Sequence, residues 1–268
     1  MKKGIKWGLI IVVCAVGLFI AGKLIWNMSL EIYRDNHKEV TKSFSKEETI
    51  DVVYIGNSLL AVPGIPYKVE KCAEVSGYSI NTYDYLSSGA SLRDALERLK
   101  KLDAMQTALA EAEVVILQEY GNHYETTYDD ICEIAKFCGE ETEIYYYLTE
   151  FDFEETLLKD IANNEKIHMI PATELVWFAV LDQGYDYEAD MLKQGDYHPS
   201  QTYAHICGLM TFSAITGQKC MDYPIAEGDD ILAYMQGETT AEKLACFNAL
   251  YEMADLMLED YENSLKTW

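Results

Sequence analysis

DVVYIGNSLL, residues 51–60, is an apolar run that stops at Gly56-Asn57-Ser58. Its β-branched and aromatic residues predict a buried strand, and Gly56 allows a sharp turn, so we expect Ser58 in a strand-to-helix loop. In an open α/β sheet this loop lies at the ligand crevice, where a serine hydroxyl can meet a base from another loop. The same block also fits an ordinary Asx or Ser turn, so alone it does not identify a nucleophile.

Beyond this strand, strand-like runs alternate with helix-like segments. We predict strands at 50–55, 79–85, 114–119, 143–148 and 166–170. We predict helices at 66–76, 92–110, 128–138, 153–162, 171–181, 201–216 and 240–265. This alternation is typical of a parallel sheet covered on both faces, so we expect a three-layer α/β/α sandwich with a central parallel sheet of about five strands.

The clearest predicted helix is 92–110. Ser91, with Asp94 three residues later, resembles a capping box at its start. Helical spacing predicts one apolar face made of Leu92, Ala95, Leu96, Leu99 and Leu102. Gly217 is expected to end the later helix at 201–216.

The first 26 residues differ from the rest of the chain. Three lysines precede an uncharged run, and the stretch 4–26 is long enough to span a bilayer. We predict an uncleaved membrane anchor at 1–26; a cleaved signal peptide is the alternative, although Ala21-Gly22-Lys23 is a poor cleavage site. The basic amino end predicts a cytoplasmic N-terminus, with the remainder outside the cell membrane. We expect a juxtamembrane stalk at 27–48 and a folded domain at 49–268.

The chain beyond the predicted anchor is strongly acidic. It holds 17 of the 21 Lys and Arg residues and all 45 Asp and Glu residues. Nucleic acid is therefore not an expected partner, because phosphate binding needs a positive field. The acids are spread over the predicted helices, which indicates a solvated surface.

Six cysteines follow the anchor at irregular spacings. Their even number permits disulfides in an exterior domain, but a core of this size does not need them. None forms a Cys-x-x-Cys pair, so a structural zinc site is not expected. We expect most of them to be small buried hydrophobic residues.

Candidate site residues follow the second and third predicted strands, at the sheet edge expected for Ser58. The first loop, 86–91, is rich in small residues, and Gly89 can present a backbone N–H to an oxyanion; a flexible lead-in to a helix explains the same residues. After the third strand, Asn122 is either an oxyanion donor or a turn residue. Gln118 is a second candidate for oxyanion or substrate contact.

The last polar cluster, 195–200, directly precedes an apolar helix. Because Ser200 or the turn at Pro199 starts that helix, His198 is expected on a rigid loop. Asp196, two residues earlier, can accept a hydrogen bond from one ring nitrogen and leave the other to act as base. A histidine in this position is usually a surface or capping residue, but its company with the other strand-end residues favours catalysis.

These blocks resemble those of the SGNH hydrolases, a family of esterases and acyl transferases with a flavodoxin-like three-layer fold. The matching pieces are Gly56-Asn57-Ser58 in place of Gly-Asp-Ser, Gly89, Gly121-Asn122, and Asp196 with His198. They extend from residue 50 to about residue 217. The Ile-Gly-Asn-Ser, Leu-Gln-Glu and His-Pro-Ser segments are similar to a poorly characterised bacterial branch.

The resemblance implies a role for each block. Ser58 is expected to be the nucleophile, His198 the base and Asp196 the acid that orients it. The N–H groups of Ser58 and Gly89 and the Asn122 amide are expected to form the oxyanion hole. No metal or organic cofactor is implied.

Two features depart from the family pattern. The family acid usually stands three residues before the histidine, where this chain has Gly195, whereas Asp196 stands at two. Some polysaccharide-acetylating relatives use the shorter spacing. The third family block usually reads Gly-x-Asn, whereas Gly121 and Asn122 are adjacent, so Gln118 remains an alternative oxyanion donor.

The implied activity is that of a serine esterase that removes acyl groups, acetyl in particular, from extracellular carbohydrate through an acyl-enzyme. The expected partners are an acylated small molecule or carbohydrate substrate and, through the N-terminal helix, the membrane. An O-acyltransferase acting on a cell-surface polysaccharide is one alternative. A non-catalytic carbohydrate-binding relative is another, but binding alone does not require Ser58, Asp196 and His198 together.

Overall fold

The computed structural model of the 268-residue chain describes residues 44–119, 124–149, 155–225 and 230–266. By its contacts the chain divides into Met1–Val40 and Thr41–Trp268, and every described residue belongs to the second unit. The predicted anchor and most of the predicted stalk lie outside the described residues. Within the described ranges, no helix is long and apolar enough to cross a membrane.

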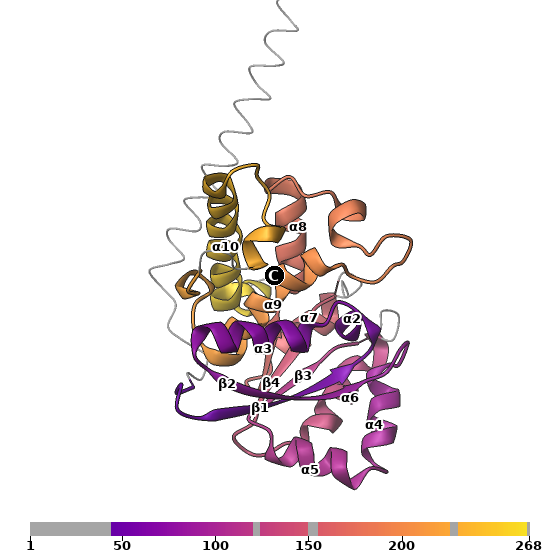
Figure 1. Cartoon of the computed structure of the whole chain (residues 1–268). Helices are drawn as coiled ribbons and strands as arrows, with labels where there is room; N and C mark the ends of the chain where they lie inside the picture. The colour runs from indigo at the N-terminus through magenta and orange to yellow at the C-terminus, as the bar shows by residue number, and fades with distance from the viewer. Residues whose placement is uncertain (1–43, 120–123, 150–154, 226–229, 267–268) are drawn as a thin grey trace, which may run out of the picture. The chain divides into compact units, whose positions relative to one another are not determined.

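The second unit is built on one parallel sheet (Figure 1). Its five strands are β1 (Thr49–Gly56), β2 (Ser79–Leu86), β3 (Val114–Leu117), β4 (Glu143–Tyr147) and β5 (Ile167–Ile170). The order across the sheet is β2-β1-β3-β4-β5, which is the flavodoxin-like order. The predicted sheet is therefore confirmed, and each strand end lies within two residues of its predicted position.

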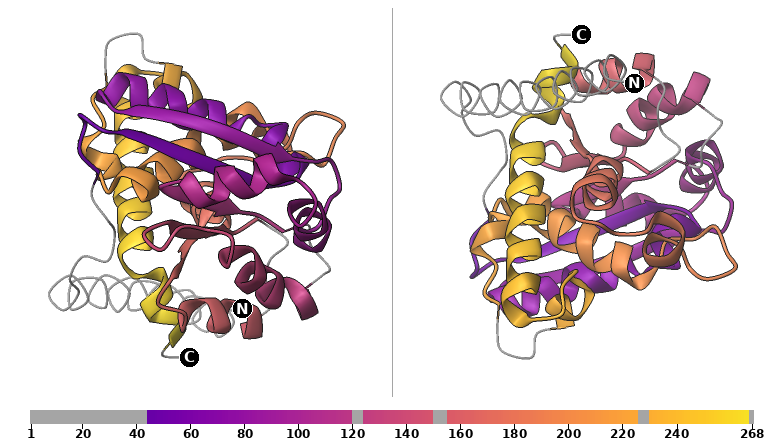
Figure 2. Two further views of the ribbon diagram at one scale, coloured as in Figure 1. Left: turned by 90° about the horizontal axis from the view of Figure 1, so that it is seen from below. Right: turned by 90° about the horizontal axis from the view of Figure 1, so that it is seen from above.

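Alternate residues of each strand face opposite layers of helices. In β1, Val52 and Tyr54 belong to one buried cluster, and Val53 and Ile55 belong to the other. The first cluster includes side chains of α3 (Ile65–Ser76), α8 (Ala172–Asp182), α9 (Gln201–Thr216) and α10 (Thr240–Lys266). The second includes those of α4 (Leu92–Leu99), α5 (Asp103–Glu111), α6 (Tyr124–Ala135) and α7 (Glu155–Ala162). Figures 1 and 2 show helices on both sides of the sheet, which confirms the predicted three-layer sandwich.

Short helical segments complete the described ranges. They are α2 (Ser58–Ala61), η1 (Tyr187–Met191), η2 (Cys220–Asp222) and η3 (Asp230–Tyr234). None of them is long enough to show the hydrophobic period from which a helix is predicted. Ser58 is the first residue of α2, and η1 precedes the loop that carries Asp196 and His198.

The single helix predicted at 92–110 is wrong, because α4 and α5 share this range. The capping box at the start is confirmed: Asp94 N donates to Ser91 Oγ (3.2 Å) and Ser91 N donates to Asp94 Oδ2 (3.0 Å). However, α4 ends at Leu99, and Leu102 adopts an extended conformation just before α5. Leu102 is consequently 48% exposed instead of lying on the buried face.

Helix α9 follows the loop that carries His198. It begins after Ser200, whose hydroxyl accepts a hydrogen bond from Tyr203 N (3.2 Å). It ends as predicted at Gly217, which has a φ of 70° that favours glycine. Between these ends, most of its residues are buried in the cluster that also contains α3, α8 and α10. The loop before it is therefore attached to a rigid element.

The six cysteines of the described ranges are free thiols. Four of them are buried: Cys72, Cys207, Cys220 and Cys246. Burial raises the pKa of the Cys138 thiol to about 12, so this cysteine is not a reactive thiolate. The prediction that most cysteines are small buried hydrophobic residues is confirmed.

Candidate active site

Ser58 begins α2 directly after β1, at the carboxyl end of a central strand. Asn57 caps this short helix, since its Oδ1 accepts a hydrogen bond from Leu59 N (3.0 Å). Asn57 is fully buried, whereas Ser58 is partly exposed. The strand order reverses between β1 and β3, and open α/β sheets bind ligands at the carboxyl ends of the strands beside such a reversal. Ser58 therefore occupies the position expected of a nucleophile.

Gln118, the first residue after β3, contacts the turn before Ser58. It is fully buried; its Oε1 accepts a hydrogen bond from Asn57 N (3.1 Å), and its Nε2 donates to Glu119 O. A Cβ atom added to Gly56 would lie 2.9 Å from Gln118 Oε1 and 3.2 Å from its backbone oxygen, so only glycine fits here. The bond to Glu119 O uses one of the two N–H donors of Nε2, so Gln118 as an alternative oxyanion donor or substrate contact stays a prediction. Its Oε1 supports the turn before Ser58.

The loop after β2 forms a turn over Ser87–Ala90, closed by a hydrogen bond from Ala90 N to Ser87 O (3.1 Å). Gly89 has a φ of 66°, which explains glycine at this position. Ser87 N donates to Gly56 O (3.0 Å), and Arg98 Nη1 of α4 donates to Ser87 Oγ. The predicted oxyanion loop is therefore tied directly to the end of β1.

The backbone N–H groups of Ser58 and Gly89 are suited to an oxyanion hole. Among the described residues, neither N–H has a hydrogen-bond acceptor. Ser58 is partly exposed and Gly89 is exposed, so both donors are open to solvent and to a ligand. Asn122, the third predicted donor, lies outside the described residues.

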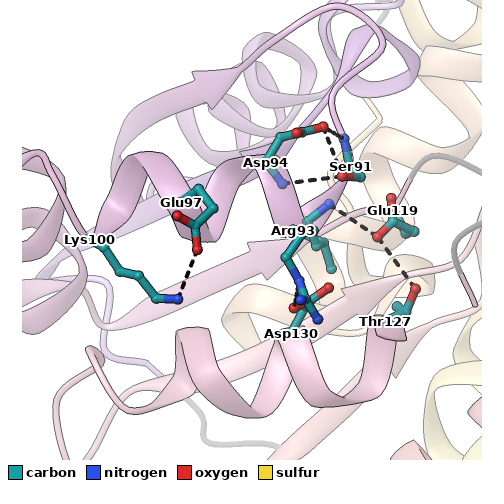
Figure 3. A network of polar contacts seen from close by, with 9 residues as sticks. Ser91, Arg93, Asp94, Glu97, Lys100, Glu119, Thr127 and Asp130 are labelled. Carbon is teal, nitrogen blue, oxygen red and sulfur yellow. Dashed lines mark hydrogen bonds and ion pairs between the residues drawn. The ribbon is translucent and has the colours of Figure 1, made fainter. Parts of the chain in front are cut away.

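Glu119 supports the same edge of the sheet. It is fully buried, and its Oε2 accepts hydrogen bonds from Leu92 N (3.1 Å) and from Thr127 Oγ1 of α6 (3.4 Å) (Figure 3). Beside it, Arg93 Nε of α4 lies 2.5 Å from Asp130 Oδ1 of α6. These bonds join the start of α4 to β3 and α6. A polar residue at a strand end is the only sequence signal for this role.

His198 lies on a closed loop between η1 and α9. A bridge between Leu192 and Pro199 closes the loop, and Lys193 N donates to His198 O (2.8 Å). Inside the loop, Asp196 Oδ1 lies 2.7 Å from His198 Nδ1. The shorter spacing of acid and base is thus compatible with direct contact between them.

The contact between Asp196 and His198 affects the pKa of Asp196 and the tautomer of the neutral imidazole. The hydrogen bond from His198 is the main cause that lowers the pKa of Asp196 from its ordinary value, and the Tyr197 N–H acts in the same direction. A charged carboxylate accepts, so the proton of the neutral imidazole belongs on Nδ1. Among the described residues, no group is hydrogen-bonded to His198 Nε2, which leaves this nitrogen as a base.

The described contacts join the candidate residues in two groups. One contains Ser58 and the Gly89 turn, and the other contains Asp196 and His198. No hydrogen bond within the described ranges joins Ser58 to His198. The helices beside the two groups are connected to each other: Gln201 Nε2 at the start of α9 donates to Pro63 O, shortly after α2 (3.1 Å).

No protein-family model and no curated protein matches this chain. Among solved structures, a DUF4886 family protein from Bacteroides uniformis is 16% identical, with a TM-score of 0.53, and the match covers 76% of this chain and 94% of that one. The lipase Lip_vut3 from a goat rumen metagenome (14% identity, TM-score 0.44) and TesA (17%, 0.45) each match over 62% of this chain and 98% of theirs. The chain therefore shares its fold with the Bacteroides protein.

Proposed function

We propose that the protein is a serine esterase in which Ser58, His198 and Asp196 act as nucleophile, base and orienting acid. The observation that carries the proposal is the 2.7 Å contact between Asp196 Oδ1 and His198 Nδ1. It leaves Nε2 of the ring free to take a proton, on a loop fixed to a buried helix. The partly exposed Ser58 hydroxyl at the end of β1 is the matching nucleophile.

The reaction follows from these roles. His198 Nε2 takes the Ser58 proton as Oγ attacks the ester carbonyl, and Asp196 stabilises the imidazolium that forms. The negative charge on the tetrahedral intermediate is accepted by the N–H groups of Ser58 and Gly89, with the Asn122 amide as third donor. His198 then protonates the leaving alcohol. Water, activated by the same ring, releases the acid from the acyl-enzyme.

The substrate class we propose is an acyl ester, acetyl in particular, on carbohydrate outside the cell. This rests on the resemblance of the four sequence blocks and on the predicted anchor, which would place the domain beyond the membrane. A sugar hydroxyl replacing water in the second step would make the same site an acyltransferase. Product analysis with and without a sugar acceptor distinguishes these two reactions.

The test uses the full-length protein in mild detergent, with p-nitrophenyl esters of increasing acyl length and acetylated sugars as substrates. Ser58→Ala should reduce kcat by several orders of magnitude, because only oxyanion and binding contributions remain when a triad nucleophile is removed. It should also abolish covalent labelling by a fluorophosphonate. The folded state of the variant is checked by circular dichroism.

Ser79→Ala is the matched control, because Ser79 lies at the opposite end of the sheet, where Thr49 Oγ1 donates to its hydroxyl (3.3 Å). It should retain activity and labelling. Comparable turnover by wild type and Ser58→Ala would show that Ser58 is not the nucleophile. Wild-type protein that neither cleaves any ester nor takes the label would contradict the proposed function.

A further inference from the structure

Asn57 connects three strand ends at once. Its Oδ1 caps α2 through Leu59 N, and its backbone N–H donates to Gln118 Oε1 after β3. The third bond runs from Asn57 Nδ2 to Ala90 O, at the far end of the turn that carries Gly89 (3.3 Å). Asn57 itself is fully buried, so its bonds to Leu59 and Gln118 are shielded from water, whereas the bond to Ala90 O is partly buried.

The partners of the Asn57 amide determine its orientation. Leu59 N can only donate, so the atom that faces it must be the amide oxygen. Ala90 O can only accept, so the atom that faces it must be the amide nitrogen. The side chain therefore uses one half to cap the nucleophile helix and the other half to hold the Ser87–Ala90 turn.

We propose that the donor half of the Asn57 amide is a positioning device that fixes the Gly89 turn relative to Ser58. This inference rests on the proposed function, in which the N–H groups of both residues bind one oxyanion. The turn is held at Ser87 by Gly56 O and Arg98, and at Ala90 by Asn57. Without the bond to Ala90, the turn keeps only its Ser87 attachment and its internal hydrogen bond.

Aspartate has the shape of asparagine but lacks this donor. In Asn57→Asp, one carboxylate oxygen can still cap α2, but the other would face the Ala90 carbonyl in a buried site. Burial and that carbonyl both raise the carboxyl pKa, and the protonated form regains an O–H that can donate to Ala90 O. The loss of kcat in Asn57→Asp should therefore be large at high pH and should diminish as the pH falls.

The charged groups of the surrounding network are common to the variant and the wild type. They are Arg98 of α4 on the Ser87 hydroxyl, Glu119 after β3 on Leu92 N, and Asp94 in the α4 capping box. His198, the proposed base, is also the same in both proteins. The ratio of variant to wild-type kcat at each pH therefore isolates the group at position 57.

The kinetic experiment measures p-nitrophenyl acetate cleavage by the full-length protein between pH 5.5 and 8.5. For Asn57→Asp at high pH we expect kcat to fall by about tenfold or more, which corresponds to the loss of about one hydrogen bond, with little change in KM. The ratio of variant to wild-type kcat should rise as the pH falls. Asn57→Ser keeps a cap but cannot reach Ala90, so its ratio should be low at every pH.

Asn164→Asp is the matched control. Asn164 Oδ1 also accepts from a backbone N–H, that of Lys166 (3.0 Å), and its Nδ2 donates to Tyr128 Oη (3.1 Å). The tyrosine hydroxyl can instead donate to a carboxylate, so this change adds the same charge without orphaning an acceptor. It should leave the kcat profile unchanged. If Asn57→Asp and Asn57→Ser both match wild type at all pH values, the positioning role is wrong.

A second measurement does not depend on catalysis. Amide hydrogen exchange of the peptide 86–92 should be faster in Asn57→Asp than in wild type at high pH, and the difference should shrink on acidification. Unchanged exchange in this peptide overturns the inference whatever the kinetics show. If wild type cleaves no ester, the proposed function fails, and the exchange data alone then decide the positioning.

Discussion

At the scale of single residues, Asp196 is the group whose charge decides whether the proposed base works. The hydrogen bond from His198 is the main cause that lowers its pKa, so the carboxylate stays ionised when the surrounding solution is near neutral. In the neutral imidazole, an ionised acceptor holds the ring proton on Nδ1 and leaves the lone pair of Nε2 available. The pair lies at the surface, so it orients the imidazole and adds little to the free energy of unfolding.

Asp196→Asn should lower kcat sharply, by as much as about 10⁴ if the triad behaves as in serine proteases. The reason is that an amide can donate to Nδ1 and so favours the wrong ring tautomer. Initial-rate measurements with an acyl p-nitrophenyl ester provide the test. Glu188→Gln, a change of an exposed upstream acid, serves as the control and should cost little. Near-wild-type turnover in Asp196→Asn would remove Asp196 from the proposed triad.

Gln118 shows the limit of prediction from residue type. A glutamine that follows a strand is a reasonable donor to an oxyanion, which is why the sequence suggests it. Its contact with the turn before Ser58 depends on the close approach of Gly56, where an added Cβ would lie 2.9 Å from Oε1. That approach is a property of two neighbouring strands, so no local pattern reveals it. The Asp196 and His198 contact, by contrast, joins residues two apart and is predictable from their spacing.

At the scale of elements, hydrophobic runs bounded by polar residues predict β1, β3, β4 and β5, because buried parallel strands contain little else. The edge strand β2 differs, since its sequence SINTYDYL is mixed and none of its residues is buried. The break between α4 and α5 is different. Residues 100–102 are Lys-Lys-Leu, with neither Gly nor Pro, so nothing in the local sequence indicates an end. A side chain across the break stabilises it: Gln106 Nε2 of α5 donates to Leu99 O, the last carbonyl of α4 (2.9 Å).

The packing of α3 against α9 contains a pH-sensitive contact. Lys68 Nζ lies 2.6 Å from His205 Nε2, and the His205 ring stacks on Tyr234 of η3 with ring centroids 3.8 Å apart. Burial, with a smaller contribution from Lys68, lowers the pKa of His205 from 6.5 to about 4, while Asp230 opposes the shift. His205 is therefore neutral in the folded protein near pH 7 and accepts from the lysine.

We expect this contact to weaken the fold in acid. Between about pH 6.5 and pH 4 the unfolded chain binds a proton at His205 and the folded chain does not. The free energy of unfolding therefore decreases as the pH is lowered through this range. The loss from this site should be about 2 kcal/mol, after discounting the shift for the partly exposed ring. His205→Gln can still accept from Lys68 but cannot titrate.

Urea unfolding of both proteins at several pH values isolates the histidine, because their carboxylates titrate alike. The expected result is that the free energy of unfolding decreases less in His205→Gln than in wild type between pH 7 and pH 4.5. Parallel pH profiles for the two proteins would show that His205 does not couple protonation to folding.

At the scale of the whole molecule, the three layers follow from the alternation of strand-like and helix-like segments along the chain, since parallel strands require crossover helices. The strand order does not follow from alternation, and the flavodoxin-like order was expected from the family resemblance alone. That order places β1 between β2 and β3, so the loops after all three strands meet at one edge. The bonds from Asn57 to Ala90 and Gln118 are the direct result.

The last prediction concerns where the domain is held. Three lysines, an uncharged run and a strongly acidic remainder predict an anchor at 1–26 with its amino end in the cytoplasm. The full-length protein should remain in the membrane pellet after carbonate washing. In intact cells without an outer membrane, external protease should remove the domain. As a control, Val13→Arg combined with Val16→Arg should prevent insertion, because each arginine costs about 2.5–3.5 kcal/mol at the centre of a span. A soluble form beginning near Lys23 would instead identify the segment as a cleaved signal peptide.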